Sequence, residues 1–236
     1  MKIDISIIIP AYNEEKRIGA TLNRIENFFS KKQETYEVIV VNDGSTDKTT
    51  DIVTNFKNKI KNLHLIELPH NKGKGFAIKM GVIKAKGDII LFTDADNSTD
   101  IAHLDYFIPY IKEKNNDIVI GSRNLTFSKI IKKQPFYRRF LSKLGNKLIN
   151  FLFSLGIKDT QCGFKLFKKD AAKKIFENLT INRWGFDIEI LVLAKLFNYK
   201  VEEVAIEWIN NPESRVKLLD FIIVLKEILK IKLNLI

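Results

Sequence analysis

The sequence predicts an α/β fold in which a mostly parallel central sheet carries helices on both faces. In residues 1–121, short apolar runs typical of strands alternate with stretches of helical periodicity, a pattern that indicates parallel strands joined by helices. Polar residues cluster directly after these runs, as expected where ligands bind beyond the carboxyl ends of parallel strands. Apolar residues make up 45% of the 236-residue chain, which is enough for a sizeable core.

The expected elements follow one another from the N-terminus. The first apolar run is rich in β-branched residues, and Pro10 ends it as a strand. Helical periodicity follows, and Ser45 or Thr46 is placed to cap the second helix. The expected strands are 5–10, 36–41, 63–68, 89–92 and 117–120, and the expected helices are 14–29, 46–59, 75–87 and 101–114.

Asp94 and Asp96 come directly after the apolar run 89–92. Because side chains alternate along a strand, two carboxylates two residues apart point the same way. They repel each other unless a cation lies between them, and oxygen ligands suit Mg²⁺ or Mn²⁺. The sequence therefore indicates a divalent metal site, with a polar turn that caps a helix as the alternative.

The formal net charge of +11 indicates a polyanionic partner or an acidic surface. Three classes of partner carry the complementary negative charge: nucleic acid, anionic lipid headgroups and phosphorylated substrates. No zinc-finger spacing or RNA-binding aromatic motif favours nucleic acid. The single cysteine, Cys162, cannot form an internal disulfide and fits a reducing compartment. No signal peptide is visible at the N-terminus.

A dinucleotide-binding Rossmann domain is the natural rival for such a strand and helix pattern. It requires Gly-x-Gly-x-x-Gly straight after the first strand, where this chain has Pro10-Ala-Tyr-Asn-Glu-Glu15. The glycine-rich stretch 73–75 lacks a third glycine and follows the third strand instead, and no phosphate-binding Gly-x-x-x-x-Gly-Lys-Ser/Thr loop is present. A nucleotide would therefore be held in another way.

The polar clusters, in this order, resemble the inverting family-2 glycosyltransferases, which have a nucleotide-binding α/β fold of the GT-A type. The matching stretches are 8–14, 40–47 and 92–96. More narrowly, the chain is similar to the dolichyl-phosphate glucosyltransferases at residues 71–77, 94–99, 121–123, 159–167 and 183–189. Dolichyl-phosphate mannosyltransferases fit the second half less well. Relatives often carry a membrane-spanning segment, and none is evident here.

This resemblance implies roles for individual residues on the donor side. Asp43 would contact the base or the ribose, Asp94 the donor ribose or the metal, and Asp96 the cation that bridges the donor diphosphate. Arg123 would face phosphate, where a planar guanidinium can bond two oxygens. The residues expected to bind the nucleotide sugar are Pro10, Ala11, Tyr12, Glu14, Asp43, Gly44, Lys74, Asp94 and Ala95.

Asp187 falls near the position where many family members keep an acidic catalytic base. A lipid phosphate has a second pKa of about 6 and arrives largely deprotonated, so it needs little help from a base. Asp187 is expected to act as a base or to orient the acceptor, with a pairing to Arg183 as the alternative, and Asp159 is the second candidate. Trp184 is a further acceptor-side candidate, with an aromatic core position as the alternative.

Residues 129–139 are basic with interleaved aromatics, and an apolar helical pattern follows through 153. With a lipid-phosphate acceptor, Arg138 and Arg139 are expected to hold the phosphate while the apolar helix lies at the bilayer surface. The alternative is a solvated charge run followed by a core helix.

The C-terminal segment 216–236 is apolar but interrupted by charges, and its longest uncharged stretch is 221–225. A membrane-spanning helix needs roughly 20 apolar residues, so we expect an amphipathic helix in the membrane plane, with an oligomer contact or a core helix as alternatives. Residues 1–215 are expected to form the catalytic domain, with a nucleotide-binding half (1–121) and an acceptor half (122–215).

Together these features predict metal-dependent, inverting transfer of glucose from UDP-glucose to dolichyl or another polyprenyl phosphate at the cytoplasmic face of a membrane, with the chain bound peripherally. Rival activities are mannosyl transfer from GDP-mannose and extension of a glycan. A catalytically silent binder of nucleotide sugar or nucleic acid is the alternative from another class, and the intact Asp94 and Asp96 pair argues against it.

Overall fold

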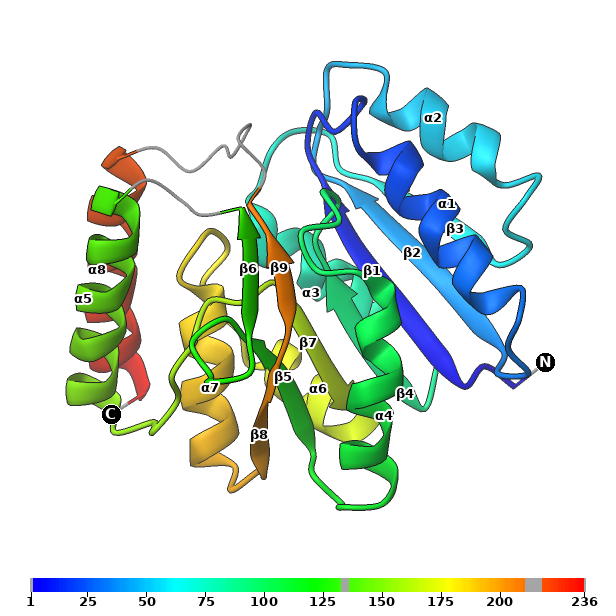
Figure 1. Cartoon of the computed structure of the whole chain (residues 1–236). Helices are drawn as coiled ribbons and strands as arrows, with labels where there is room; N and C mark the ends of the chain where they lie inside the picture. The colour runs from blue at the N-terminus through cyan, green and yellow to red at the C-terminus, as the bar shows by residue number, and fades with distance from the viewer. Residues whose placement is uncertain (1, 133–135, 211–217, 236) are drawn as a thin grey trace.

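The computed structural model describes residues 2–132, 136–210 and 218–235, with residues 136–139 and 218–220 described in their backbone only. Its centre is a seven-stranded sheet with the strand order β3-β2-β1-β4-β7-β5-β8 (Figure 1). The strands are β1 (Ile5–Ala11), β2 (Tyr36–Asn42), β3 (Leu63–Glu67), β4 (Ile89–Thr93), β5 (Ile118–Ser122), β7 (Phe164–Lys168) and β8 (Val201–Ala205).

All neighbouring strands of this sheet are parallel except β7, which runs antiparallel to both β4 and β5. The carboxyl ends of β1, β2, β4 and β5 therefore lie at one edge of the sheet. Because β7 runs the opposite way, the residues that lead into it lie at this same edge, where Phe164 pairs with Thr93. The predicted α/β fold with a mostly parallel sheet is confirmed, whereas the sequence did not indicate the antiparallel strand.

Helices cover both faces of the sheet. Successive side chains of β1 point to opposite faces, so Ile7 and Ile9 join one core and Ile8 joins the other. The first core is closed by α1 (Ile18–Phe29), α2 (Thr49–Phe56), η1 (Ile101–His103) and α4 (Leu104–Lys112). The second is closed by α3 (Lys74–Lys84), α6 (Lys169–Glu177) and α7 (Phe186–Leu196).

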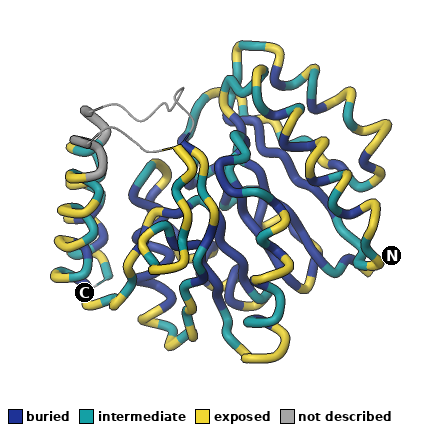
Figure 2. Tube along the Cα trace, in the orientation of Figure 1, coloured by how far each residue is buried: buried dark blue, intermediate teal, exposed yellow. Residues whose placement is uncertain are grey.

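Two longer helices, α5 (Phe136–Phe153) and α8 (Leu218–Leu235), lie side by side at one end of the molecule (Figure 1). Their inner residues Ile149, Phe153, Ile228 and Ile231 are buried in the second core, and their outer surface is largely exposed (Figure 2). A small parallel sheet of β6 (Lys129–Lys132) and β9 (Glu207–Ile209) completes the fold.

Among the helices of residues 2–132, 136–210 and 218–235, none is long and apolar enough to cross a membrane.

The start of α2 differs from the prediction that Ser45 or Thr46 caps it. The Ser45 hydroxyl instead accepts the backbone N–H of Asn13 at 2.8 Å, and the helix begins at Thr49. The Asp47 carboxylate accepts the Thr49 N–H at 3.0 Å. The loop after β2 is thus longer than expected, because its polar side chains are bonded to the loop after β1.

Candidate active site

The loop after β2 is organised around Asp43, which is buried. Its carboxylate accepts the backbone N–H groups of Lys72 at 2.7 Å and Gly73 at 2.9 Å, and its own N–H donates to the carbonyl of Ala11 at 2.8 Å. Burial raises the pKa of the Asp43 carboxyl, although the two backbone donors act in the opposite direction. Asp43 therefore joins the ends of β1 and β2 to the segment that opens α3.

Gly44 is a position that the backbone requires to be glycine. Its φ is +73°, in the left-handed region, and a Cβ there would lie 2.6 Å from the carbonyl carbon of His70. This close approach brings the loop that follows β3 next to Asp43. The predicted donor-binding residues Asp43 and Gly44 thus help to fix the position of the segment containing Lys74.

The predicted donor-binding residues after β1 have different environments. Ala11 is buried, Pro10 is half-buried and the Tyr12 side chain is exposed. The Glu14 carboxylate accepts two bonds from the Arg17 guanidinium, both at 2.6 Å. This ion pair holds the Glu14 carboxylate beside the residue that precedes α1.

Asp94, Asp96 and Lys74 meet at the end of β4. The Lys74 ammonium lies 2.6 Å from Oδ1 of Asp94, and the Asp96 carboxylate accepts the Ser98 N–H at 3.0 Å. Burial acts to lower the pKa of Lys74, but the carboxylates of Asp94 and Asp187 outweigh it and raise this pKa. Burial and the neighbouring Asp94 also raise the pKa of Asp96. Lys74 thus pairs with Asp94 and is also influenced by the charges of Asp96, which follows the same strand, and of Asp187 on α7.

The buried residue Ala95 lies between these carboxylates, and the Thr21 hydroxyl of α1 donates to its carbonyl at 2.7 Å. This bond fixes the backbone between Asp94 and Asp96 against the first helix. The predicted pair therefore lies on a turn that a side chain of α1 holds in place.

Gly163, just before β7, passes closer to Asp94 than any other residue type allows. A Cβ at this position would lie 2.0 Å from Oδ2 and 2.5 Å from Cγ of Asp94. The neighbour that the structure places against Gly163 is the Asp94 carboxylate.

We expect Gly163→Ala to displace the Asp94 carboxylate and to lower turnover by up to about 10²-fold, the cost of a misplacement near 1 Å. The free energy of unfolding should change far less, since the carboxylate lies at the end of a flexible side chain. Steady-state kinetics and chemical denaturation of the variant check both expectations. Gly156→Ala is the control, because a Cβ there meets no atom within 4 Å, although its φ of +71° adds local strain. Equal turnover losses in the two variants would contradict the expectation.

Asp187 lies in the first turn of α7 and is buried. Its carboxylate forms an ion pair and hydrogen bond with the ammonium of Lys165 on β7. Lys165 is itself 0% exposed, and it also donates to the carbonyl of Cys162 at 2.8 Å. Burial raises the pKa of Asp187, and the lysines Lys165 and Lys74 oppose this rise.

Lys165 is not among the site residues predicted from the sequence, although it is central to this arrangement. The available signal was a cation in the middle of the apolar run 164–167, because a lysine is almost never fully buried without a partner. Periodicity could not identify that partner, which lies 22 residues further along the chain.

Arg123 and Asp159 form a second buried unit at the same edge of the sheet. The Asp159 carboxylate accepts the Arg123 backbone N–H at 2.9 Å and two guanidinium bonds at 2.7 Å. The guanidinium carbon lies 5.3 Å from the centre of the Trp208 ring. Although burial opposes it, the charge of Arg123 holds the pKa of the Asp159 carboxyl below its ordinary value. These bonds use two of the five N–H donors of the guanidinium.

Cys162 is buried beside these groups. Burial raises the pKa of its thiol to about 12. A thiol that stays protonated is neither a nucleophile nor a metal ligand at neutral pH.

Three further acceptor-side candidates lie outside the two units described above or outside the described side chains. Trp184 is half-buried in the turn before α7. Arg138 and Arg139 lie in the first turns of α5, and their side chains are outside the described residues. Their predicted contact with an acceptor phosphate stays a prediction.

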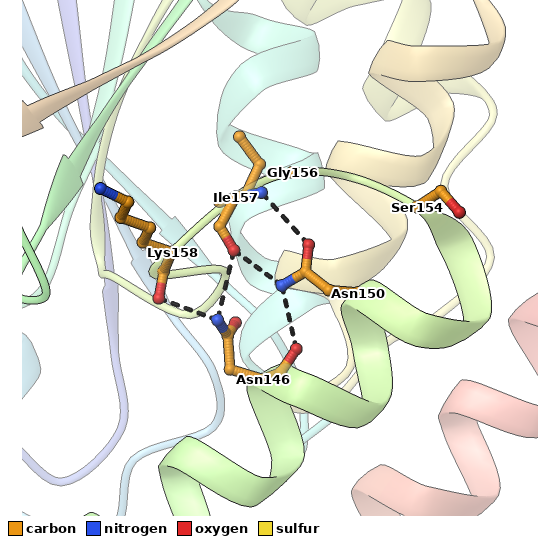
Figure 3. A pocket seen from close by; sticks show the side chains of 6 residues that line it. All are labelled: Asn146, Asn150, Ser154, Gly156, Ile157 and Lys158. Carbon is orange, nitrogen blue, oxygen red and sulfur yellow. Dashed lines mark hydrogen bonds between the residues drawn. The ribbon is translucent and has the colours of Figure 1, made fainter.

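A pocket lies between α5 and the segment that follows it (Figure 3). It is lined by Asn146, Asn150, Ser154, Gly156, Ile157 and Lys158. The amide of Asn150 donates to the Ile157 carbonyl at 2.8 Å and accepts the Ile157 N–H at 3.2 Å. None of the predicted site residues lines this pocket, and its asparagines serve to hold the backbone of the turn.

Within residues 2–132, 136–210 and 218–235, no group of three or more His, Cys, Asp or Glu side chains is arranged to hold a metal ion. Mg²⁺ is commonly bound through one or two carboxylates together with substrate phosphates and water. Asp94 and Asp96 supply two carboxylates, and their mutual repulsion favours a cation between them. The residues present therefore fit a metal that the substrate helps to bind.

Residues 6–176 match the sequence profile of Glycosyl transferase family 2. The chain is 39% identical to dolichyl-phosphate beta-glucosyltransferase ALG5D of Trichomonas vaginalis, with 98% of this chain and 73% of the relative covered. It is 37% identical to the dolichyl-phosphate beta-glucosyltransferase of Homo sapiens, with 86% and 67% covered.

Solved structures share the fold at lower sequence identity. Glucosyl-3-phosphoglycerate synthase from Mycobacterium tuberculosis, in complex with Mn²⁺, UDP and glucosyl-3-phosphoglycerate, has a TM-score of 0.74 at 16% identity, with 98% of this chain and 79% of that chain covered. TarS 1–349 of S. aureus, in complex with UDP-GlcNAc, has a TM-score of 0.65 at 22% identity, with 99% and 67% covered.

Proposed function

The chain belongs to glycosyl transferase family 2 and has the GT-A fold, and we propose that it transfers glucose from UDP-glucose to dolichyl or another polyprenyl phosphate. The single observation that carries the proposal is the meeting of Asp94, Asp96 and Asp187 around Lys74 at the carboxyl edge of the sheet. Similarity to dolichyl-phosphate beta-glucosyltransferases over nearly the whole chain supports glucose and a lipid phosphate as the substrates.

The donor nucleotide binds across the ends of β1 and β2 in this proposal. Asp43 uses part of its acceptor capacity on Lys72 and Gly73, and the remaining lone pairs face the base or the ribose. The glycine-rich segment that bears Lys74 thereby stays fixed relative to the nucleotide.

A divalent ion would be held by Asp94 and Asp96, and when bound it would neutralise charge on the leaving diphosphate. Lys74 and Arg123 supply further positive charge to the same diphosphate. Asp159 holds the Arg123 guanidinium in place through two side-chain bonds. Such fixed charges stabilise the transition state more than the ground state, because the diphosphate gains negative charge as it leaves.

In the reaction, an oxygen of the acceptor phosphate attacks the anomeric carbon from the side opposite the nucleotide. The new carbon–oxygen bond forms as the bond from the anomeric carbon to the diphosphate breaks, and UDP leaves with the bonding electrons. The product is a β-linked glucosyl lipid phosphate, since attack from the opposite side inverts the anomeric centre.

Asp187 acts in this proposal as an orienting group and not as a base. Its carboxylate is bonded to the Lys165 ammonium and contributes to the charge around Lys74, and the acceptor phosphate is already largely ionised at neutral pH.

We therefore expect Asp187→Asn to lower kcat by about tenfold. The acid limb of the pH profile of kcat/KM should stay in place, because that limb reports the acceptor phosphate with its pKa of about 6. Activity measured from pH 5 to 9 checks this. Disappearance of the acid limb together with a loss of about 10²- to 10⁴-fold would assign Asp187 as the general base.

The acceptor lipid approaches from the side of α5 and α8 in this proposal. Exposed apolar side chains follow helical spacing along each helix and form two stripes: Phe140, Leu144, Leu148 and Phe151 on α5, and Ile222, Leu225, Leu229 and Leu233 on α8. Exposed lysines accompany both stripes, namely Lys143, Lys147, Lys226 and Lys230. Apolar stripes flanked by cations suit the headgroup region of an anionic bilayer, here its cytoplasmic face.

We expect Leu229→Glu with Leu233→Glu to weaken binding to vesicles containing anionic lipid by at least about tenfold, because burying each leucine contributes about 1.5–3 kcal/mol. Point changes are preferable to truncation after Arg215, since α8 also supplies Ile228 and Ile231 to the core. Co-sedimentation with vesicles measures the binding. Ile83→Glu, at an exposed position on α3, is the control, and unchanged binding in the double variant would reject the membrane-facing role.

The proposed function is tested by incubating the full chain with dolichyl phosphate and each nucleotide sugar in turn. We expect transfer from UDP-glucose with Mg²⁺ or Mn²⁺, loss of transfer with a chelator, and a β-anomeric product by NMR. Transfer from GDP-mannose alone would correct the sugar. Absence of transfer from every donor would refute the proposal.

A further inference from the structure

The C-terminal helix α8 touches the segment that carries Asp187. Oε2 of Glu227 accepts the backbone N–H of Gly185 at 2.7 Å, and Gly185 immediately precedes α7. A Cβ at Gly185 would lie 2.8 Å from the Cβ of Glu227, so the two segments are in close contact. The Gly185 carbonyl in turn accepts the N–H groups of Ile188 and Glu189. Glu227 therefore holds the end of α7 that bears Asp187.

The other outer helix, α5, touches the segment that carries Asp159. The amide of Asn146 donates to the carbonyls of Ile157 at 3.2 Å and Lys158 at 2.8 Å (Figure 3). Its carbonyl oxygen accepts the hydroxyl of Thr160 at 2.9 Å. These contacts lie on both sides of Asp159, the residue that holds the Arg123 guanidinium.

The two outer helices are also joined to each other. The Lys232 ammonium of α8 donates to the carbonyl of Leu152 at 3.1 Å, and it lies 5.8 Å from the centre of the Phe153 ring. Inner residues of both helices share one core. A displacement of one helix therefore affects the packing of the other.

We propose that the α5–α8 pair is a positioning element for the acceptor side of the active site, with Glu227 acting on Asp187 and Asn146 acting on Asp159. Asp159 and Gly185 lie outside regular secondary structure. Side-chain oxygens accept their backbone N–H groups, Glu203 for Asp159 at 3.0 Å and Glu227 for Gly185 at 2.7 Å. The same helices carry the exposed apolar stripes that face the lipid. The two helices thus connect the surface proposed to meet the acceptor's lipid with the residues proposed to lie near its phosphate.

This inference rests on the proposed function only in identifying the acceptor as a lipid phosphate. The positioning role predicts that the segments around Asp159 and Gly185 are ordered. Hydrogen exchange measures this order without any substrate. A group misplaced by about 1 Å costs up to about 10²-fold in rate, so the contacts are also expected to appear in kcat.

The test compares Glu227→Ala, Glu227→Gln and Asn146→Ala in the full chain, with Glu177→Ala as a control at an exposed helical glutamate on α6. In Glu227→Ala we expect amide exchange at 185, 188 and 189 to accelerate by about tenfold or more, because the Gly185 N–H loses its acceptor. Glu227→Gln keeps a carbonyl oxygen that accepts the same N–H and should restore slow exchange. Asn146→Ala should accelerate exchange at 160 instead, because the Asn146 carbonyl oxygen accepts the Thr160 N–H at 3.4 Å.

The same variants are then assayed with UDP-glucose and dolichyl phosphate. We expect Glu227→Ala to lower kcat by about tenfold with an unchanged KM for UDP-glucose and unchanged vesicle binding, and Glu227→Gln to recover most of the rate. If Glu227 served stability alone, Glu227→Ala would accelerate exchange throughout the chain and lower the melting temperature. It would not lower kcat selectively at an unchanged KM for UDP-glucose.

Unchanged exchange at 185–189 in Glu227→Ala, or equal disruption in the alanine and glutamine variants, would overturn the inference. A wild-type chain that transfers no glucose would refute the proposed function separately, and the exchange measurements would still decide the positioning role.

Discussion

Replacing Asp96 by asparagine is expected to lower glucose transfer by about 10³-fold, the upper range for the loss of one electrostatic contact to a developing charge. Asparagine keeps the shape of aspartate and an oxygen that can accept the Ser98 N–H, which lies 3.0 Å from Oδ1 of Asp96. The substitution therefore removes one negative charge without removing the local bond. Steady-state kinetics over a series of Mg²⁺ and Mn²⁺ concentrations measures the effect.

A matched control separates this effect from a general change in charge. Asp105→Asn removes an exposed carboxylate that pairs with Lys32 at 2.6 Å, and such a pair contributes about 0–1 kcal/mol to stability. The control should transfer glucose at the wild-type rate. If Asp96→Asn also kept its rate, the assignment of Asp94 and Asp96 to a metal-dependent step would be wrong.

Replacing Lys165 by methionine is expected to lower the free energy of unfolding by about 3–5 kcal/mol, the usual cost of leaving one member of a buried ion pair without its partner. Lys165 is 0% exposed, and its ammonium is bonded to the Asp187 carboxylate and the Cys162 carbonyl. Methionine has a similar length but cannot donate to either oxygen. Urea denaturation followed by circular dichroism measures the loss.

The double variant Lys165→Met with Asp187→Leu provides the control for this prediction. Replacing both members of a buried pair by apolar side chains is often neutral, because no charge remains buried alone. The double variant should thus be more stable than Lys165→Met by itself, a non-additivity that a double-mutant cycle reports directly. A loss below about 1 kcal/mol in the single variant would show that the pair is not coupled in the folded protein.

The donor side of the site follows closely from the sequence. Each polar cluster directly follows an apolar run, and parallel strands place their carboxyl ends at one edge. This reasoning correctly located the residues after β1, β2 and β4 at a common edge. The roles of Asp43, Asp94 and Asp96 in binding remain predictions that the variants above test.

The acceptor side follows from the sequence much less completely. Nothing in the run 164–167 shows that β7 enters the sheet in the opposite direction, between β4 and β5. Yet this insertion places Gly163 against Asp94. It also brings the Lys165 ammonium into contact with the Asp187 carboxylate. It also places Asp159 beside Arg123, where the Asp159 carboxylate pairs with the guanidinium.

The sequence by itself determined the α/β architecture, the edge of the sheet at which the chemistry is expected, and the pair Asp94 and Asp96. Period-two and helical patterns are local features of the sequence. Because the strands that they predict run parallel, the carboxyl ends of these strands lie at one shared edge. The tertiary structure decided which polar groups pair: Lys74 with Asp94, Lys165 with Asp187, and Glu227 with the Gly185 N–H. Such pairings depend on burial and on distances between segments far apart in the chain, and no local pattern encodes them.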